Sequence, residues 1–307
     1  MRSRLLRPIA LAIAYGVSCH FPTHAQIGAS ATVSEGQNRG ICPTSALADY
    51  KQPSVPQVTI AELAFDGDLH MPTADLEQIS ASLKQRTYSG NLDEVTSEAL
   101  DRVKGAWWDR GYVKAQAQGK VTVLTSGPLS KRIAVAVRVE EGQQYRLGEI
   151  TFKNNRAISN TQALRDQFSL TDGDVFDRPA VSKGLDNLRF AYGQLGYINF
   201  TSVSNIRFNE EQQTISIDVD LDEGKQFYIS GINFLGLDEP SSQNLLKDLL
   251  LLRRGNVYNQ RLVNLAFKAQ PSLVPTDTTP ESRVRLQLDE RAATVGITLD
   301  FRPCPVE

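Results

Sequence analysis

Histidine and cysteine are scarce in this sequence of 307 residues, which contains three of each. Two of the histidines precede residue 25, so a Ser-His-Asp or Cys-His arrangement would depend on His70, which has no motif around it. Cys42 and Cys304 have no close cysteine neighbours, which argues against a cysteine-based zinc site. No glycine-rich phosphate loop stands in the required context. We therefore predict no catalytic residue, no metal, no cofactor and no small-molecule substrate.

Long apolar runs are also lacking, because no stretch after the N-terminal region is long enough for a transmembrane helix. Residues 1–25 have the organisation of a secretory signal peptide: three arginines, an apolar segment over 8–17, and Ala25 at the cleavage point. The alternative is that Gly16–Cys19 is a lipidation motif whose cysteine carries an anchor. Both alternatives predict an exported protein.

Neither sign of charge is in large excess, with 33 basic and 35 acidic residues and a net charge of −2. Loss of the three leader arginines changes this value to −5. A mildly acidic chain without a basic block is a poor candidate for binding nucleic acid, and we expect no such partner.

Two cysteines, Cys42 and Cys304, remain after a leader is removed, and an even pair in an exported chain is a disulfide candidate. Three units of about 30 Å would span about 90 Å, whereas the 15 residues between Cys42 and Val58 reach about 50 Å at full extension. An internal bridge therefore requires a bent array. A bridge between two chains and two unpaired thiols remain open alternatives.

The same apolar spacing opens three successive segments of the chain, with steps of two, three and two residues. The sets are Val58, Ile60, Leu63 and Phe65; Tyr145, Leu147, Ile150 and Phe152; and Phe227, Ile229, Ile232 and Phe234. Steps of two are typical of a strand with one buried face, and the step of three indicates a bulge. Gly148 and Gly231 lie at that step. The spacing predicts a bent first strand in each copy.

Two helices are predicted after each first strand. Thr73 in the first copy and the pair Ser159 and Gln162 in the second have the positions of helix N-caps. In the second copy, Asp177 followed by Pro179 predicts the start of the longer second helix.

The second helix ends in the same way in two copies. Gly111-Tyr112 and Gly196-Tyr197 follow its last turn, where glycine adopts the left-handed conformation that terminates a helix and tyrosine begins the next strand. Two hairpins are predicted to follow, over 112–123 with 132–140 and over 197–208 with 214–222.

Each closing strand runs through an acidic-glycine turn into the next first strand. The segments VRVEEGQQYRLGEITF and VDLDEGKQFYISGINF, 82 residues apart, share six of their sixteen positions, where chance would give roughly one. We predict an α+β fold of tandem β-α-α-β-β units over 57–142, 143–224 and 225–307, after a linker over 26–56. The third unit is expected to be degenerate and short, because Pro271 interrupts its second helix and no Gly-Tyr follows.

A β-α-α-β-β unit whose second helix ends in Tyr-x-x-x-Gly-Tyr resembles a POTRA domain. Two segments carry the motif: Tyr192, Gly196 and Tyr197 in full, and Trp107, Gly111 and Tyr112 with tryptophan replacing the first tyrosine. The opening motif, which includes Phe65, Phe152 and Phe234 in the three copies, is similar to the start of these modules. POTRA domains form the periplasmic arms of BamA-like and TamA-like outer-membrane assembly factors and of two-partner secretion transporters.

The resemblance implies a periplasmic scaffold, associated with the bacterial outer membrane, that acts in outer-membrane protein assembly or protein secretion. Its partners would be an outer-membrane β-barrel protein or an unfolded outer-membrane or secreted polypeptide, bound by β-strand addition. By the same resemblance, the edge is the second strand of each unit. In the middle copy this strand carries Ile198, Phe200, Val203 and Ile206, which are either edge residues or the core face of the sheet.

One departure and two alternatives accompany this expectation. In these families the last POTRA domain leads into a transmembrane barrel, whereas only 17 residues follow Glu290, so we expect a section of a longer protein, a truncated product or a stand-alone POTRA protein. The first alternative function is an envelope adaptor that binds peptidoglycan or a partner, with Trp107-Trp108 as a candidate sugar surface. The second, a hydrolase with paired carboxylates among the 35 acidic residues, is the weaker.

Overall fold

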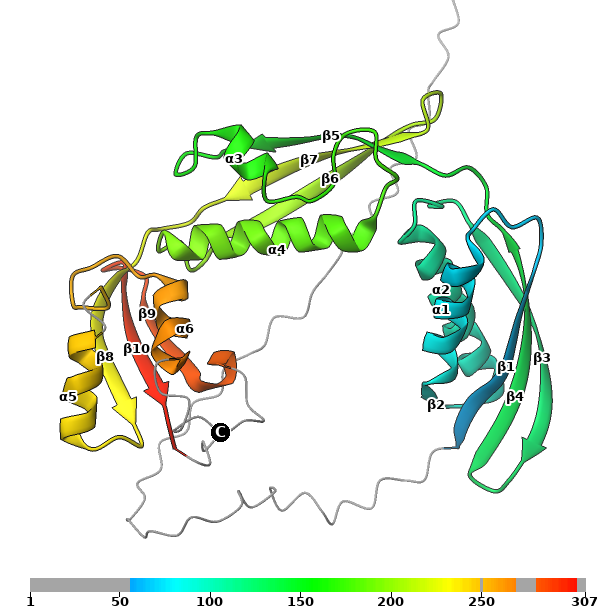
Figure 1. Cartoon of the computed structure of the whole chain (residues 1–307), viewed down its shortest axis with the longest axis horizontal. Coiled ribbons are helices and arrows are strands. Elements are labelled where there is room, and N and C mark those ends of the chain that lie inside the picture. The colour runs from blue at the N-terminus through cyan, green and yellow to red at the C-terminus, as the bar shows by residue number, and fades with distance from the viewer. Residues whose placement is uncertain (1–55, 249–250, 269–279, 303–307) are drawn as a thin grey trace, which may run out of the picture. The chain divides into compact units, whose positions relative to one another are not determined.

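The computed structural model of this chain describes residues 56–248, 251–268 and 280–302, all of which belong to one unit of the chain, Ile41–Glu307. Three separate sheets, each with its own helices, follow one another along the sequence (Figure 1). The predicted leader and its Cys19, together with Cys42 and Cys304, lie outside the described residues, as do Pro271 and all of the predicted linker except Pro56.

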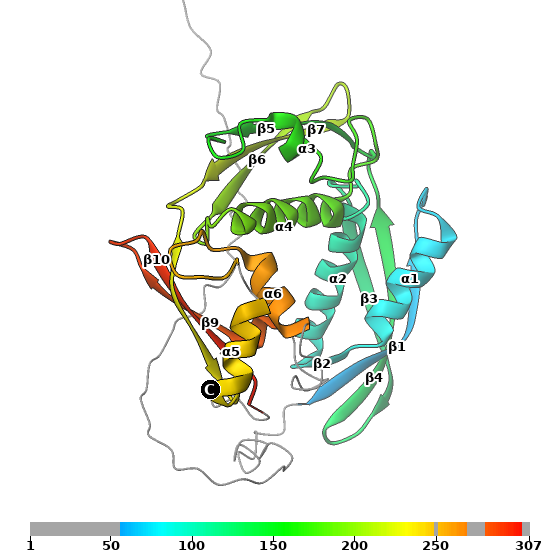
Figure 2. The ribbon, with the colours of Figure 1, turned by 60° about the vertical axis from the view of Figure 1, so that its left-hand side comes forward.

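The first unit is a sheet of four strands in the order β2-β1-β4-β3, with two helices packed against it (Figure 2). Its elements are β1 (Gln57–Asp66), α1 (Thr73–Lys84), β2 (Thr87–Ser89), α2 (Leu92–Trp108), β3 (Gln116–Ser126) and β4 (Ser130–Glu140). Strand β4 pairs in parallel with β1 and antiparallel with β3, so the last strand of the unit lies in the middle of its sheet.

The second unit repeats this topology with three strands in the order β5-β7-β6, and α4 runs along one face of the sheet (Figure 1). Its elements are β5 (Arg146–Lys153), α3 (Thr161–Arg165), α4 (Arg178–Gln194), β6 (Thr201–Asn209) and β7 (Thr214–Asp222).

The third unit has the strand order β8-β10-β9, which is the same topology again. Its elements are β8 (Tyr228–Leu235), α5 (Glu239–Asp248), α6 (Gln260–Lys268), a short 3-10 helix (Pro280–Arg283), β9 (Val284–Asp289) and β10 (Thr294–Asp300). The described part of α6 ends at Lys268, and the predicted break at Pro271 lies outside the described residues. The predicted α+β class with tandem β-α-α-β-β units is confirmed.

The first strand of every unit carries the bulge that its spacing predicts. The register with the parallel partner shifts by one residue after Ile60, after Leu147 and after Ile229, which are equivalent positions. The extra residue lets two apolar side chains before the bulge and two after it face the same core, although an odd step separates them.

The helix starts follow the predictions only in part. Asp177 caps α4 as predicted, because its side chain accepts from the Ala180 N–H. Ser159 is not the cap of α3; Asn160 is, and α3 has only one turn. Thr73 is not a cap either, since it is the first residue of α1 and no side chain caps that helix. The first strand of each predicted hairpin begins four residues later than predicted, at Gln116 and Thr201, because a turn separates it from the end of the helix.

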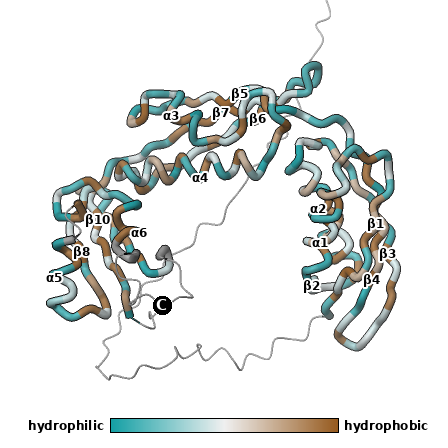
Figure 3. The backbone as a smooth tube through the Cα atoms, in the orientation of Figure 1, coloured by the Kyte–Doolittle hydropathy of each residue, from teal (hydrophilic) through white to brown (hydrophobic). Residues whose placement is uncertain are grey.

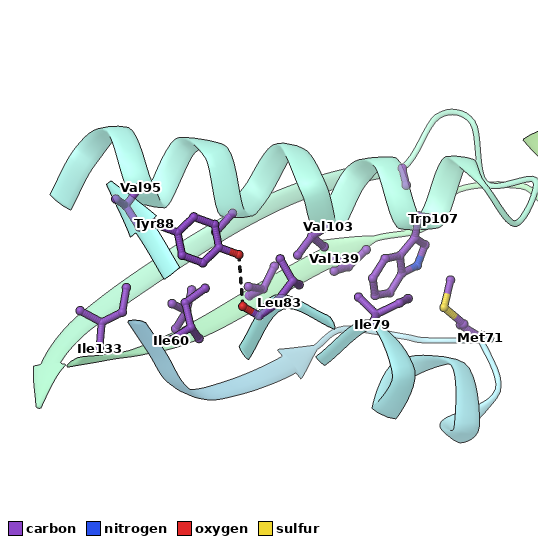
Figure 4. Close-up of a cluster of buried hydrophobic side chains, with 14 of the residues drawn as sticks. Ile60, Met71, Ile79, Leu83, Tyr88, Val95, Val103, Trp107, Ile133 and Val139 are labelled. Carbon is purple, nitrogen blue, oxygen red and sulfur yellow. Dashed lines mark hydrogen bonds between the residues drawn. The ribbon is translucent and has the colours of Figure 1, made fainter. Parts of the chain in front are cut away.

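Each unit has its own apolar core between its helices and its sheet. Helix α4 alternates between hydrophilic and hydrophobic segments along its length, as expected for a helix with one buried face (Figure 3). In the first unit, Trp107 is fully buried at the end of α2, where Met71 and Ile79 lie nearby, and the Tyr88 hydroxyl donates to the Leu83 carbonyl at 3.3 Å (Figure 4). The closing strand is the centre of each core because it is paired on both sides.

Candidate functional site

One edge of each sheet is partly covered by the segment that precedes the second helix. In the first unit this segment forms β2 and pairs with β1. In the other units it is reduced to single bridges, Arg146 with Val175 and Tyr228 with Val257. The opposite edge, formed by β3, β6 or β9, has no strand partner within the part of the chain that the structure describes. These strands leave backbone groups available for another polypeptide.

Strand β6 is an uninterrupted edge of nine residues that pairs with β7 without a register shift. Ile206 and Phe208 lie opposite Ile217 and Ile215, which are buried in the core, so they point to the face of the sheet that packs on the helices. They are nevertheless 53% and 52% exposed. The edge therefore has a half-covered apolar border.

The other face of β6 is polar apart from Val203, which is 62% exposed opposite Asp220. The Arg207 guanidinium reaches Asp218 at 2.8 Å and Glu149 at 3.2 Å. Its hydrogen bond, followed by that of the Thr151 hydroxyl, lowers the pKa of Asp218 to about 2. The outer face of β6 is thus charged and exposed to solvent, in contrast to the apolar border formed by Ile206 and Phe208.

The four residues predicted for this edge do not lie together. Val203 and Ile206 are in β6 but on opposite faces. Phe200 precedes the strand, is 4% exposed and stacks on the Tyr192 ring with centroids 4.2 Å apart, so it is a core residue. Ile198 packs against the core of the third unit. Phe208 belongs to the apolar border and was missed, although its spacing of two from Ile206 was a usable signal.

The Gly-Tyr sequence ends a helix and also joins two units. Gly111 and Gly196 have a φ of +86°, and the following tyrosine N–H bonds back to the carbonyl of Trp107 or Tyr192. This arrangement is a Schellman motif. Tyr112 and Tyr197 thus have matching backbone surroundings in the two units.

The carbonyl of each of these glycines accepts a hydrogen bond from the first aromatic residue of the next unit. The Tyr145 N–H donates to Gly111 and the Phe227 N–H donates to Gly196, both at 2.9 Å. The side chain of the preceding glutamine, Gln144 or Gln226, donates to the carbonyl just before the glycine. The same joint therefore forms twice, and this explains why the junction sequence recurs.

A glutamate in the acidic-glycine turn ties the end of the long helix to the loop after the first strand. Glu141 is 3% exposed and accepts from Trp107 Nε1 at 2.9 Å and from the backbone N–H groups of His70 and Met71. In the second unit, Glu223 accepts from the Tyr192 hydroxyl at 3.0 Å and from the Ala157 N–H at 2.9 Å. Burial, followed by this hydrogen bond, raises the pKa of Tyr192.

The three phenylalanines that close the first-strand motif all pack at the border of their cores. Phe65 meets the Trp107 ring edge-on with centroids 5.2 Å apart, and Phe152 lies 5.9 Å from Phe168. Phe234 packs against the third core, 6.4 Å from Phe301. They are structural residues in the same place in each unit.

The hairpin tip after β6 is held by Lys114 of the preceding unit and by Tyr145 of its own unit. Glu210 accepts from Lys114 Nζ at 2.6 Å and from the Tyr145 hydroxyl at 2.5 Å. The Lys114 ammonium, followed by the Tyr145 hydroxyl, lowers the pKa of Glu210. The Tyr145 ring also contacts Phe208 edge-on at 5.9 Å. One end of the apolar border is therefore anchored to the joint.

The geometry offers little to support catalysis or metal binding. Within the described ranges, no group of three or more His, Cys, Asp and Glu side chains is placed to hold a metal ion. The Nδ1 atom of His70 lies 3.4 Å from a carboxylate oxygen of the buried Glu141. Nor does any described helix combine the length and apolar character needed to cross a membrane.

Comparison with known proteins is informative at the level of domains. The family model "POTRA: Surface antigen variable number repeat" matches residues 145–224. The chain carries a POTRA domain. The POTRA fold extends over the other units, because the crystal structure of Haemophilus influenzae BamA POTRA3-5 covers 80% of this chain and 96% of its own, with a TM-score of 0.57 and 20% identity.

Two curated relatives are much longer than the part of them that matches this chain. A putative outer membrane protein assembly factor of Treponema pallidum is 24% identical over 239 residues, which are 74% of this chain and 28% of the relative. The outer membrane protein assembly factor BamA of Neisseria meningitidis is 24% identical over 221 residues, 66% of this chain and 27% of the relative. This chain thus spans less than a third of the length of these relatives.

The POTRA joint predicts a large penalty for a side chain at Gly196. A Cβ there would lie 2.7 Å from Val257 Cγ1 and 3.1 Å from the Phe227 carbonyl oxygen, in addition to the strained φ. Gly196→Ala should lower the free energy of unfolding by more than the roughly 1–2 kcal/mol of a left-handed alanine. Gly173→Ala is the matched control, because Gly173 has a φ of +92° but no atom within 4 Å of a Cβ. Equal losses in urea unfolding would contradict a packing role for the joint.

The glutamate tie predicts unequal effects of the same substitution in two units. Glu141→Gln places an amide group opposite buried donors and should cost about 1–3 kcal/mol of unfolding free energy. Glu223→Gln should cost less, because Glu223 is only partly buried and water can replace the lost acceptor. Chemical denaturation of both variants measures the difference, and a larger loss for Glu223→Gln would show that the assignment is wrong.

Proposed function

We propose that this chain is a periplasmic scaffold that binds extended segments of outer-membrane or secreted polypeptides by adding them as a strand to β6. The observation that carries the proposal is the edge itself: a strand of nine residues that pairs with β7 on one side and with no other described strand, bordered by the half-exposed Ile206 and Phe208. Its curated relatives are named as outer membrane protein assembly factors, which supports a role in that process.

Strand β6 is the best of the three available edges. Strand β3 has a bulge at Leu124, which breaks the regular spacing of its backbone groups. Strand β9 has only six residues. An added strand on β6 can form a longer continuous ladder than on either of the others, because main-chain hydrogen bonds accumulate with length.

The two faces of β6 define the chemistry of the added segment. Side chains of an added strand alternate between the face of Ile206 and Phe208 and the face of Arg207. A strand with apolar residues at every second position would cover the apolar border and leave its polar residues in water. Strands that alternate in this way are characteristic of outer-membrane polypeptides.

The adaptor alternative has less support. Trp107 is fully buried and donates to Glu141, so it is not available to stack on a sugar. Trp108 is 38% exposed. Because the Trp107 ring is buried, it cannot form a sugar-stacking surface together with Trp108. The contacts and burial favour polypeptide binding over peptidoglycan binding, and binding over bond-making chemistry.

A pair of neighbouring prolines tests strand addition at β6. Along an edge strand, successive N–H groups alternate between the paired neighbour and the open side. Of Val203→Pro and Ser204→Pro, one should break the ladder to β7 and destabilise the unit, while the other should retain the fold and lose a donor to the added strand. The well-folded variant should bind a labelled ten-residue alternating apolar-polar peptide on the order of tenfold more weakly than the unaltered chain.

The control for this experiment is a proline in β3, at Val121 or at Thr122. Of Val121→Pro and Thr122→Pro, the control is the one whose unfolding midpoint in urea is the same as that of the unaltered chain. Fluorescence anisotropy measures the peptide affinity, and a scrambled peptide without alternation measures non-specific binding. If the folded β6 variant binds as tightly as the unaltered chain, the peptide does not add to this edge.

A further inference from the structure

The tip of the β3–β4 hairpin in the first unit differs from the tips of the other two hairpins. In the second unit, the tip residue Glu210 bonds Lys114 of the unit before it. In the third unit, the side chain of Glu290 accepts from Asn199 of the second unit, and its backbone carbonyl accepts from Lys225 at the start of the third. Among the described residues no unit precedes the first one, and its tip makes no such contact with them.

The side chains at this first tip are apolar and exposed. Val123, Leu124 and Leu129 are 43%, 43% and 49% exposed. Leu124 is the extra residue of the bulge in β3. The backbone around them is bonded, with the Gly127 N–H donating to Ser130 and the Gln57 N–H donating to Leu129. The tip therefore presents a small, ordered group of aliphatic side chains.

The charge of this hairpin is opposite in sign to that of its counterpart. Gln116–Glu140 contains four basic residues and a single acidic one, which is the last residue of β4, whereas Thr201–Asp222 contains one basic and five acidic residues. Lys120, Lys131 and Arg132 lie closest to the tip, and none of them forms an ion pair with any other residue that the structure describes. Free basic side chains thus flank an apolar tip.

We propose that the β3–β4 hairpin tip, Val123 to Arg132, contacts the surface of an anionic lipid bilayer. Three half-exposed aliphatic side chains present on the order of 200 Å², far less than the roughly 800 Å² per partner of a stable protein interface. A lipid surface needs no such area, because shallow insertion of a few apolar groups and attraction of basic residues to anionic headgroups add together. This inference goes beyond polypeptide binding, and it involves a different strand.

Vesicle sedimentation tests the proposal with the full chain. Vesicles of phosphatidylcholine and phosphatidylglycerol should bind it, phosphatidylcholine vesicles should bind it on the order of tenfold more weakly, and added salt should reduce binding. The double variant Leu124→Asn with Leu129→Asn and the double variant Lys131→Gln with Arg132→Gln should each reduce binding to anionic vesicles on the order of tenfold. The unaltered chain and all variants contain the same residues 1–55, so any contribution of these residues to vesicle binding is the same in every sample.

Val203→Asn with Ile206→Asn is the matched control, because it removes two exposed apolar side chains from β6 and should leave vesicle binding unchanged. The tip variants should retain the urea midpoint and the affinity for the alternating peptide, which separates this proposal from the proposed function. Unchanged vesicle binding by both tip variants would overturn it, since another region would then hold the lipid. Absence of binding to anionic vesicles by the unaltered chain would also overturn it and would favour a protein partner for the tip.

Discussion

A glutamate in the turn between two units is the contact on which the architecture depends. Glu141 joins the end of α2 to the backbone of the loop after β1, and its carboxylate is buried with three hydrogen-bond donors around it. A buried carboxylate without such donors would be costly, so the loop and the helix end are held together in one arrangement. The glycine that follows then turns the chain into the next first strand.

The same tie explains why the third unit differs from the others. By its strand register, the position equivalent to Glu223 is Pro303, and the third copy has no aromatic-glycine-tyrosine helix end. The donor and the acceptor of the tie are therefore missing from the sequence together.

The POTRA topology separates the stability of the chain from the surface that we propose for binding. The closing strand of each unit lies at the centre of its sheet and contributes three or four buried side chains to the core, while the second strand remains at the edge. Residues such as Ile206 and Phe208 can therefore be apolar and exposed without loss of the fold. Differences between units, such as the basic hairpin of the first and the acidic hairpin of the second, can then arise on one common framework.

Several elements were predictable because their signals are local. The bulges after Ile60, Leu147 and Ile229 follow from an odd step in the apolar spacing, and the helix ends at Gly111 and Gly196 follow from the conformation that only glycine adopts easily. The Asp177 cap was also predictable, because its signal, an aspartate two residues before a proline, is local in the sequence. The cap of α3 was predicted wrongly at Ser159, because Ser159 and Asn160 are both good caps and only the path of the entering loop selects Asn160.

The amino-acid sequence by itself therefore determined the repeat, the bent first strands, the order of helices and strands, and the close approach at each Gly-Tyr, because these depend on spacing and on backbone conformation. The tertiary structure alone decided which side chains in β6 and directly before it are exposed. Phe200 and Phe208 have the same residue type and an even spacing, yet one stacks on Tyr192 and the other lies at the open edge. Their difference depends on where the helix covers the sheet, and that is a property of packing between segments distant in the sequence.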